Sequence, residues 1–275
     1  MAFEDSLREV PKHFAAGGDL VFSHIAATLS AVFPDGEDYF VRSVRHFRSA
    51  VDDPALLPQV SGFIGQEAMH GREHRIFNRR LAELGYPTLL FERATTLGLG
   101  VAEKVLPAKA NLAVTAALEH FTATLAELLL ADEEVRSLFG HDEVQGLFLW
   151  HALEESEHKA VAFDVYRHVG GSERLRRVVM DGVTLGFLGG VGLGLGISLL
   201  TDRATYNPRT LWRSLNRVVR SPIVRRSVWR ELRAYNRQGF HPDDRDATAL
   251  VEQWRVELFG ENGSLTEKLV GTGRR

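Results

Sequence analysis

Apolar residues recur at three- and four-residue intervals through most of this chain, which is the spacing of α-helices. The first such run extends from Leu20 to Val32, and Pro34 then interrupts it. Asp35 is the expected N-cap of a second helix over residues 36–51. Further helices are expected over four ranges: 54–84, 91–106, 108–130 and 143–169. The pattern predicts an all-α fold.

Two of the predicted helices carry ionisable side chains on faces that are otherwise apolar. Six residues have the three- and four-residue spacing that places them on the inner faces of the helices 54–84 and 143–169: Glu67, His70, His74, His151, Glu155 and His158. Most lie in mid-helix, where neither a cap nor the helix dipole accounts for them. Burying these groups would be costly unless a cation lay between them. Carboxylates and imidazoles are ligands for iron, manganese or zinc, so a metal pair is expected here.

Two other predicted helices each carry a single Glu on an apolar face. Glu37 precedes Val41 and Val44 on its face. This position makes Glu37 a candidate buried metal ligand. Because it also occupies a first helical turn, where the helix dipole favours a carboxylate, a purely structural role remains open as well. Glu119 lies among small or apolar residues, which predicts an open space beside its carboxylate. His120 points about 100° away from Glu119 and is a weaker candidate ligand.

The four predicted helices together have the ligand order of a dinuclear carboxylate centre. One Glu from each of two helices, with a Glu-x-x-His from each of the other two, is the pattern of ferritin-like metal bundles. The 49 positions from His70 to Glu119 provide the long crossover that such a bundle needs. We therefore expect a ferritin-like four-helix bundle with a dinuclear metal site and additional C-terminal helices.

Composition narrows the choice of chemistry. The 275 residues include no Cys, which excludes disulfides, cysteine-ligated clusters and cysteine nucleophiles and is consistent with a cytoplasmic location. The net charge of −3 provides no strong field toward nucleic acid, and none is expected as a partner. The first residues carry charges and no apolar run, so no secretory signal is expected.

Three stretches around the candidate ligands carry a family pattern. They are residues 33–37 (Phe-Pro-Asp-Gly-Glu), residues 63–70 (Phe-Ile-Gly-Gln-Glu-Ala-Met-His) and residues 150–164, which begin Trp-His-Ala-Leu-Glu-Glu-Ser-Glu-His. Together they resemble a bacterial family labelled predicted metal-dependent hydrolase within the ferritin-like superfamily. The resemblance extends through residues 239–244 and so covers most of the chain. It implies a metal-dependent protein without specifying its mechanism.

The acidic and imidazole residues are also similar to the ligands of the p-aminobenzoate N-oxygenases, which are non-heme diiron enzymes. Their last ligand helix carries His-x-x-x-Glu-x-x-His, which corresponds here to His151, Glu155 and His158. This resemblance implies seven metal ligands: Glu37, Glu67, His70, Glu119, His151, Glu155 and His158. His74 falls outside that set and is expected to support a ligand. Glu154 and Glu157 are expected either to lie on the surface or to support a ligand. Asp164 is a weaker candidate for the same role.

The expected function is that of an O₂-dependent monooxygenase that N- or C-oxygenates a small, hydrophobic or aromatic substrate. Two iron ions would be the cofactor, with manganese or zinc as alternatives, and O₂ would be the co-substrate. The four carboxylates of Glu37, Glu67, Glu119 and Glu155 would be terminal or bridging ligands at the catalytic centre. An external electron donor is expected. The first alternative is a binuclear hydrolase, and the second is a non-catalytic metal-binding or membrane-associated protein.

The C-terminal third has a different composition. Residues 183–200 carry no charge, and three arrangements are considered: a segment buried on the bundle, an interfacial contact, or a membrane span. Residues 203–237 alternate arginines with apolar residues, so the region 183–237 is a candidate for peripheral membrane contact or for packing on the bundle or another subunit. The expected division is a metal-binding bundle over 1–180 and an extension over 181–275. A homodimer is left open, and the tail from Ser264 onward is expected to be frayed.

Overall fold

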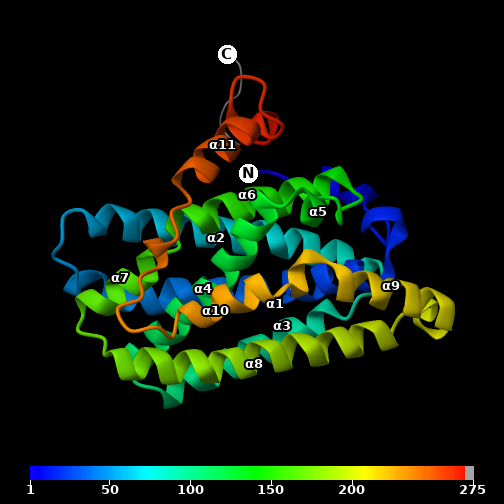
Figure 1. Ribbon diagram of the computed structural model, residues 1–275. Helices are drawn as coiled ribbons and strands as arrows, with labels where there is room; N and C mark the ends of the chain where they lie inside the picture. Colours follow the sequence, from blue (N-terminus) through cyan, green and yellow to red (C-terminus); the bar gives the residue numbers. More distant parts are fainter. Residues whose placement is uncertain (270–275) are drawn as a thin grey trace.

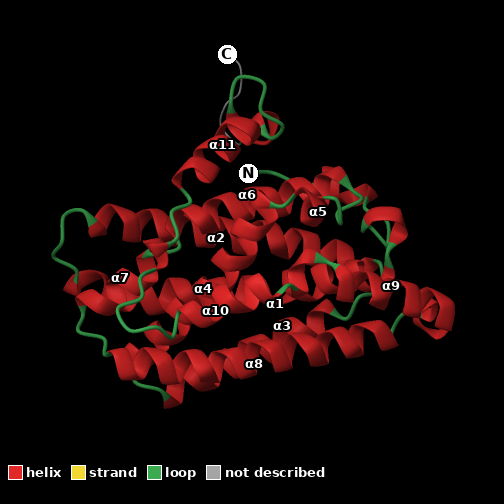
Figure 2. Cartoon of the chain, viewed as in Figure 1, coloured by secondary structure: helices red, strands yellow, loops and turns green. Residues whose placement is uncertain are grey.

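The computed structural model describes residues 1–269, and within them every extended regular element is a helix (Figures 1 and 2). Short 3₁₀ turns connect many of the helices. The α-helices are α1 (Leu20–Phe47), α2 (Leu56–Glu83), α3 (Thr88–Val105), α4 (Ala108–Ala131), α5 (Glu133–Arg136), α6 (Asp142–His158), α7 (Val161–His168), α8 (Glu173–Leu200), α9 (Pro208–Arg220), α10 (Arg226–Ala234) and α11 (Thr248–Phe259). The predicted all-α class is confirmed, and α2, α3 and α4 lie close to their predicted ranges.

Four of the long helices pack lengthwise: α1 against α2, and α4 against α6, which α7 continues. Their apolar side chains form two clusters. One includes Phe77 and Trp150, and the other includes Phe63 and Phe121. The middle turns of α1, α2 and α4 and the last two turns of α6 lie between the clusters. Polar groups placed there are shielded from water on both sides.

Helix α1 continues through Pro34, so the predicted interruption and the N-cap at Asp35 are wrong. Proline has no backbone N–H, which leaves the carbonyl four residues earlier, that of Ser30, without its helical partner. The Asn78 side chain on α2 donates to that carbonyl at 3.0 Å. A neighbouring helix therefore replaces the missing hydrogen bond, and α1 is continuous through Pro34. Its N-cap is Asp19, whose carboxylate accepts from the Phe22 N–H.

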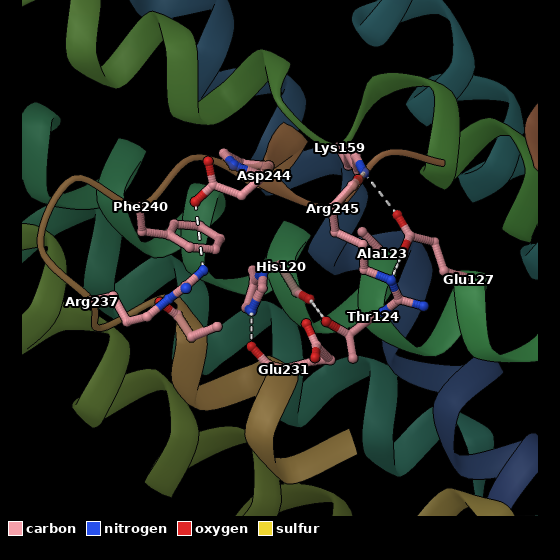
Figure 3. A pocket seen from close by; sticks show the side chains of 12 residues that line it. His120, Ala123, Thr124, Glu127, Lys159, Glu231, Arg237, Phe240, Asp244 and Arg245 are labelled. Carbon is pink, nitrogen blue, oxygen red and sulfur yellow. Dashed lines mark hydrogen bonds and ion pairs between the residues drawn. The ribbon is translucent and has the colours of Figure 1, made fainter. Parts of the chain in front are cut away.

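The predicted helix over 143–169 is instead two helices, α6 and α7, which meet at Lys159 and Ala160. The Lys159 side chain is 7% exposed and points to α4, where its Nζ lies 2.9 Å from Glu127 Oε1. Nζ also donates to the carbonyl of Arg245, and Arg245 Nε lies 2.8 Å from Glu127 Oε2 (Figure 3). The buried Lys159–Glu127 pair, with the exposed Arg245 on its outer side, ties the α6–α7 junction to α4 and to the segment before α11. Lys159, placed at the junction, fixes the end of α6.

Replacing Glu127 with Gln is expected to lower the free energy of unfolding by about 3–5 kcal/mol, because Lys159 would remain buried without its counter-charge. Chemical denaturation of the metal-free protein would measure the change. Glu252→Gln is the matched control, since Glu252 pairs with Arg255 at an exposed site and its loss should cost at most about 1 kcal/mol. Equal effects of the two substitutions would contradict the structural role given to Lys159.

The predicted domain boundary between residues 180 and 181 falls inside a continuous helix, α8. It lies along the bundle and contacts α1 and α4. Its C-terminal end is held by buried polar groups: His24 Nδ1 lies 2.7 Å from Ser198 Oγ, and His24 Nε2 lies 3.3 Å from Asp202 Oδ2. His13 Nε2 and Lys12 Nζ reach the same carboxylate oxygen, at 2.8 and 3.2 Å. Because the Lys12 ammonium already neutralises that oxygen, this group of side chains is better explained as a salt-bridge cluster around Asp202 than as a metal site.

The buried His24 of this salt-bridge cluster predicts a pH dependence of stability. Burial lowers the pKa of His24 from 6.5 to about 4. Between these values the unfolded chain binds a proton that the folded protein excludes, so stability is fully present above pH 6.5 and falls as the pH drops toward 4. The expected slope is up to about 1.4 kcal/mol per pH unit. His24→Gln should remove this part of the slope in chelator-treated protein, and unchanged slopes between pH 4.5 and 6.5 would refute the assignment.

The chain after α11 returns to the bundle. Leu265 is buried in the cluster that contains Phe3, and Lys268 Nζ lies 2.6 Å from Glu143 Oε2 on α6. The expectation of a frayed tail is therefore wrong for residues 264–269. Residues 270–275 of that predicted tail lie outside the described part of the chain.

Candidate metal centre

Seven buried side chains converge between the two apolar clusters, and they are the seven that the sequence predicts as ligands: Glu37, Glu67, His70, Glu119, His151, Glu155 and His158. Helix α1 contributes the first, α2 the next two, α4 the fourth and α6 the last three. Gly71 on α2 makes room for this approach, because a Cβ there would lie 3.3 Å from the Glu37 carboxylate and 3.0 Å from Arg75.

Glu155 lies at the centre of the group. Its Oε1 is 3.1 Å from His151 Nε2, 3.6 Å from His158 Nε2 and 3.6 Å from His70 Nδ1. One carboxylate oxygen therefore lies close to the imidazoles of two helices. This is the position expected for a ligand shared between two ions.

The remaining donors fall on two sides of Glu155. On one side, His151 Nε2 lies 3.7 Å from Glu37 Oε1. On the other, His158 Nε2 lies 3.0 Å from Glu67 Oε1 and 3.6 Å from Glu119 Oε2. Two donor triads with no residue in common can each hold a metal ion: Glu37 with His70 and His151, and Glu67 with Glu119 and His158. A further triad, Glu67 with His70 and Glu155, overlaps both, so the whole group offers donors for metal ions.

Many polar atoms of this group have no hydrogen-bond partner. They include both carboxylate oxygens of Glu37 and Glu119 and Oε2 of Glu67. Buried polar groups are almost always paired, and each unpaired one costs of the order of 1–3 kcal/mol. Such a concentration is unfavourable for the protein alone. Divalent cations would satisfy these atoms together, so the residues fit a metal centre.

The pKa values show the same need for positive charge. Burial, and then the Glu67 carboxylate, raise the pKa of Glu37 well above its usual value. Burial and the Glu155 carboxylate do the same to the pKa of Glu119. Burial opposes protonation of His70, but the nearby carboxylates of Glu154 and Glu67 outweigh it and raise the pKa of His70 to about 10. Protons partly neutralise the carboxylates when no cation does, and metal binding must therefore displace protons.

Each imidazole of the group has a polar partner on its outer nitrogen. His70 Nε2 lies 3.0 Å from Glu154 Oε2. His158 Nδ1 lies 3.1 Å from Gln66 Oε1, and the Gln66 amide donates to Glu157. Such partners fix the ring orientation and the tautomer of a metal-binding imidazole. Of the two predicted alternatives, Glu154 and Glu157 therefore occupy the supporting positions.

His151 is held by a longer chain of hydrogen bonds. Its Nδ1 lies 2.7 Å from His74 Nε2, and His74 Nδ1 lies 2.9 Å from Ser30 Oγ. The Ser30 hydroxyl then donates to Asn78 Oδ1 at 2.7 Å. If Nδ1–H of each imidazole is the donor, His74 Nε2 accepts and His151 Nε2 is left to bind inward, so the chain is consistent from end to end. His74 supports a candidate ligand, as predicted from its position outside the ligand set.

Several contacts were not predictable from the sequence. Gln66 precedes Glu67, so its proximity to the site could have been inferred, but Ser30 and Asn78 carry no such signal. His120 points away from the group and bonds the Glu231 carbonyl at 2.9 Å (Figure 3). Asp164, a weaker candidate supporting residue, pairs instead with His241 at 2.8 Å.

An apolar cavity of about 460 Å³ reaches the group of ligands. Its walls are almost entirely apolar side chains and glycines from α1, α3, α4 and α8, and Glu37 and Glu155 are the two carboxylates that line it. The open space predicted beside Glu119 is therefore beside these two residues instead. From α4, the lining consists of Val114, Leu118 and Thr122. The cavity gives a small apolar molecule a path to the centre.

Comparison with known proteins gives one match. The model of a family described as predicted metal-dependent hydrolase matches residues 1–246, which include every residue of the candidate centre. No curated protein and no solved structure matched the chain. The buried Glu and His groups agree with the metal dependence in that description. This chain belongs to the family of predicted metal-dependent hydrolases.

Proposed function

We propose that this protein is a dinuclear metal enzyme of ferritin-like architecture that uses O₂ to oxygenate a small apolar substrate, with two iron ions as its cofactor. The observation that carries the proposal is the donor set: four carboxylates and three imidazoles, all buried, open to an apolar cavity. Iron bound to such a mixed set can change between its ferrous and ferric states and so supply O₂ activation.

The protein's own residues would have three tasks. Glu155, nearest to both donor triads, would bridge the ions, with Glu37 completing one side and Glu67 and Glu119 the other. The outer contacts of Glu154, His74 and Gln66 would hold the imidazoles in place. The apolar clusters and cavity walls would exclude water and orient the substrate against Glu37 and Glu155.

A binuclear hydrolase is the second candidate, and the family description favours it. In that case the two ions would lower the pKa of a bound water, and the cavity would hold the apolar part of an ester or amide. The lining argues for the oxygenase, because hydrolysis needs polar groups for the scissile carbonyl and for the leaving group. Among the residues that line the cavity, the other polar side chains are the hydroxyls of Thr28, Thr95 and Thr122.

The two candidates are separated by loading metal-free protein with Fe²⁺ under anaerobic conditions and then adding O₂. The oxygenase predicts O₂ consumption coupled to oxidation of about two iron ions per chain, measured with an oxygen electrode and by Mössbauer spectroscopy. Zinc-loaded protein is the control and should consume none. Failure of the iron-loaded protein to consume O₂, together with cleavage of p-nitrophenyl esters by the zinc or manganese form, would replace the proposal with the hydrolase.

A further inference from the structure

Helix α8 presents an apolar face to solvent. No charged residue occurs between Asp181 and Asp202. The exposed fractions of Leu185 and Leu193 are 77% and 67%. By length and composition, α4 and α8 are both apolar enough to cross a membrane. Helix α4 is mostly buried in the bundle, whereas only 11% of the most apolar 18-residue window of α8 is buried. A single exposed leucine is ordinary, but a whole uncharged helix face in water is not.

The attachments of α8 show how it could meet a bilayer. Near its start, Arg176 is fully buried and donates to the carbonyl of Arg237 at 2.8 Å. Near its end, Ser198 contacts His24 on α1. Between them, a Cβ at Gly194 would lie 3.1 Å from Thr28 of α1. A helix fastened to the bundle at both ends cannot cross a membrane without the bundle, so it would lie in the plane of the surface.

Helix α3 extends this face on the other side of the cavity. Figure 1 shows α3 and α8 running along the same edge of the molecule. Leu97 and Val101 of α3 are exposed, and neighbouring residues of both helices line the cavity. The cavity therefore opens between two helices that both expose apolar side chains, although α3 also exposes Arg93 and Lys104. Its mouth and the apolar face coincide.

Helix α9 carries an independent sign of the same kind. It follows α8 after one 3₁₀ turn, Arg203–Tyr206. One of its faces exposes Trp212, Leu215 and Val219, while its arginines lie on another face. Arg217 pairs with Asp19, but three arginines of α9 make no ion pair within residues 1–269: Arg209, Arg213 and Arg220. Exposed apolar and aromatic residues on one face, with unpaired arginines beside them, are typical of helices that lie at a membrane surface.

The charges around the apolar face favour anionic lipid over a second copy of the chain. Arg174 precedes the uncharged stretch of α8 and Arg203 follows it, and neither makes an ion pair within residues 1–269. Arg177 pairs with Glu173 at 3.5 Å, and the acidic residues Asp181 and Asp202 lie at the two ends of the stretch. Phosphate headgroups would complement Arg174, Arg203 and the three unpaired arginines of α9. A second copy would instead cover the mouth of the cavity.

We propose that the exposed faces of α3, α8 and α9 dock the protein on an anionic phospholipid bilayer, with the cavity mouth open to the hydrocarbon layer. The docking stands on its own observations. Its consequence for the reaction rests on the proposed function: the substrate would be an apolar or amphiphilic molecule that enters from the lipid phase.

The test is co-sedimentation of the full chain with vesicles made of equal parts phosphatidylcholine and phosphatidylglycerol. The wild-type protein should bind, and the double variant Leu185→Asp/Leu193→Asp should bind at least about tenfold more weakly. Neither leucine lines the cavity, so metal content should not change. Val256→Asp on α11 is the control, because Val256 is comparably exposed but lies outside the proposed face, and it should bind as the wild type does.

Two kinds of result would overturn the proposal. One is wild-type protein that stays in the supernatant, or a double variant that sediments as the wild type does. The other is a wild-type dimer in analytical ultracentrifugation without vesicles that the double variant converts to monomer, since the face would then bind a second copy. Vesicle binding by iron-loaded protein that does not consume O₂ would refute the proposed oxygenase while leaving the docking intact.

Discussion

Substitution of Glu155 by Gln is expected to produce a folded protein that binds at most one metal ion per chain and has no measurable turnover. Glu155 Oε1 lies within 3.6 Å of imidazole nitrogens of His70, His151 and His158, so it is the carboxylate oxygen best placed to contact both ions of the proposed centre. An amide cannot supply the negative charge that two dications require. Removing an outer partner of a ligand already costs about 10- to 100-fold in metal affinity. Loss of the shared ligand should exceed about 100-fold.

The measurement is metal content by mass spectrometry after dialysis, with thermal unfolding in the presence and absence of metal. A 100-fold loss of affinity removes about 2.7 kcal/mol of metal-dependent stabilisation. Glu143→Gln is the matched control on the same helix, since Glu143 pairs with Lys268 at the other end of α6. Two ions per chain in Glu155→Gln, or the same metal loss in Glu143→Gln, would show that Glu155 is not the shared ligand.

Helical periodicity predicts which of these side chains share a face, whereas the choice of His151 over His74 as a ligand rests on the resemblance to the N-oxygenases. Glu67 and His70 share a face of any α-helix that contains them, as do His151, Glu155 and His158. The energetic argument adds that such a face is stable only around a common cation. These local rules do not require knowledge of how the helices pack.

The errors arose where a distant residue changed a local preference. Pro34 was expected to end a helix, but Asn78, 44 positions later, supplies the missing hydrogen bond. No glycine or proline marks the end of α6, because that junction depends on Lys159 pairing with Glu127 of another helix. The exposed face of α8 was likewise not predictable. Its composition shows that it is apolar but does not reveal which side the bundle covers.

Filling the cavity from α8 is expected to block access to the centre without affecting the metal. Gly190 lines the cavity, and a Cβ added there meets no atom within 4 Å, so Gly190→Phe can place its ring in the open space without moving the backbone. Binding of an apolar fluorescent probe such as 1-aminoanthracene should weaken by at least about tenfold. Loss of about 60 Å² of buried apolar surface corresponds to about 1.5 kcal/mol, or roughly that factor in Kd.

Gly192→Phe is the matched control on the same helix. Gly192 does not line the cavity, and a Cβ there also meets no atom within 4 Å. Two residues along a helix correspond to a rotation of about 200°, so this ring points away from the cavity. Both substitutions raise helix propensity by a similar amount. Metal content should therefore be unchanged in both variants, and probe binding and turnover should be reduced in Gly190→Phe alone. Equal probe binding by the two variants would mean that apolar ligands reach the centre by another route, and the assignment of the cavity between α3 and α8 as the substrate site would fail.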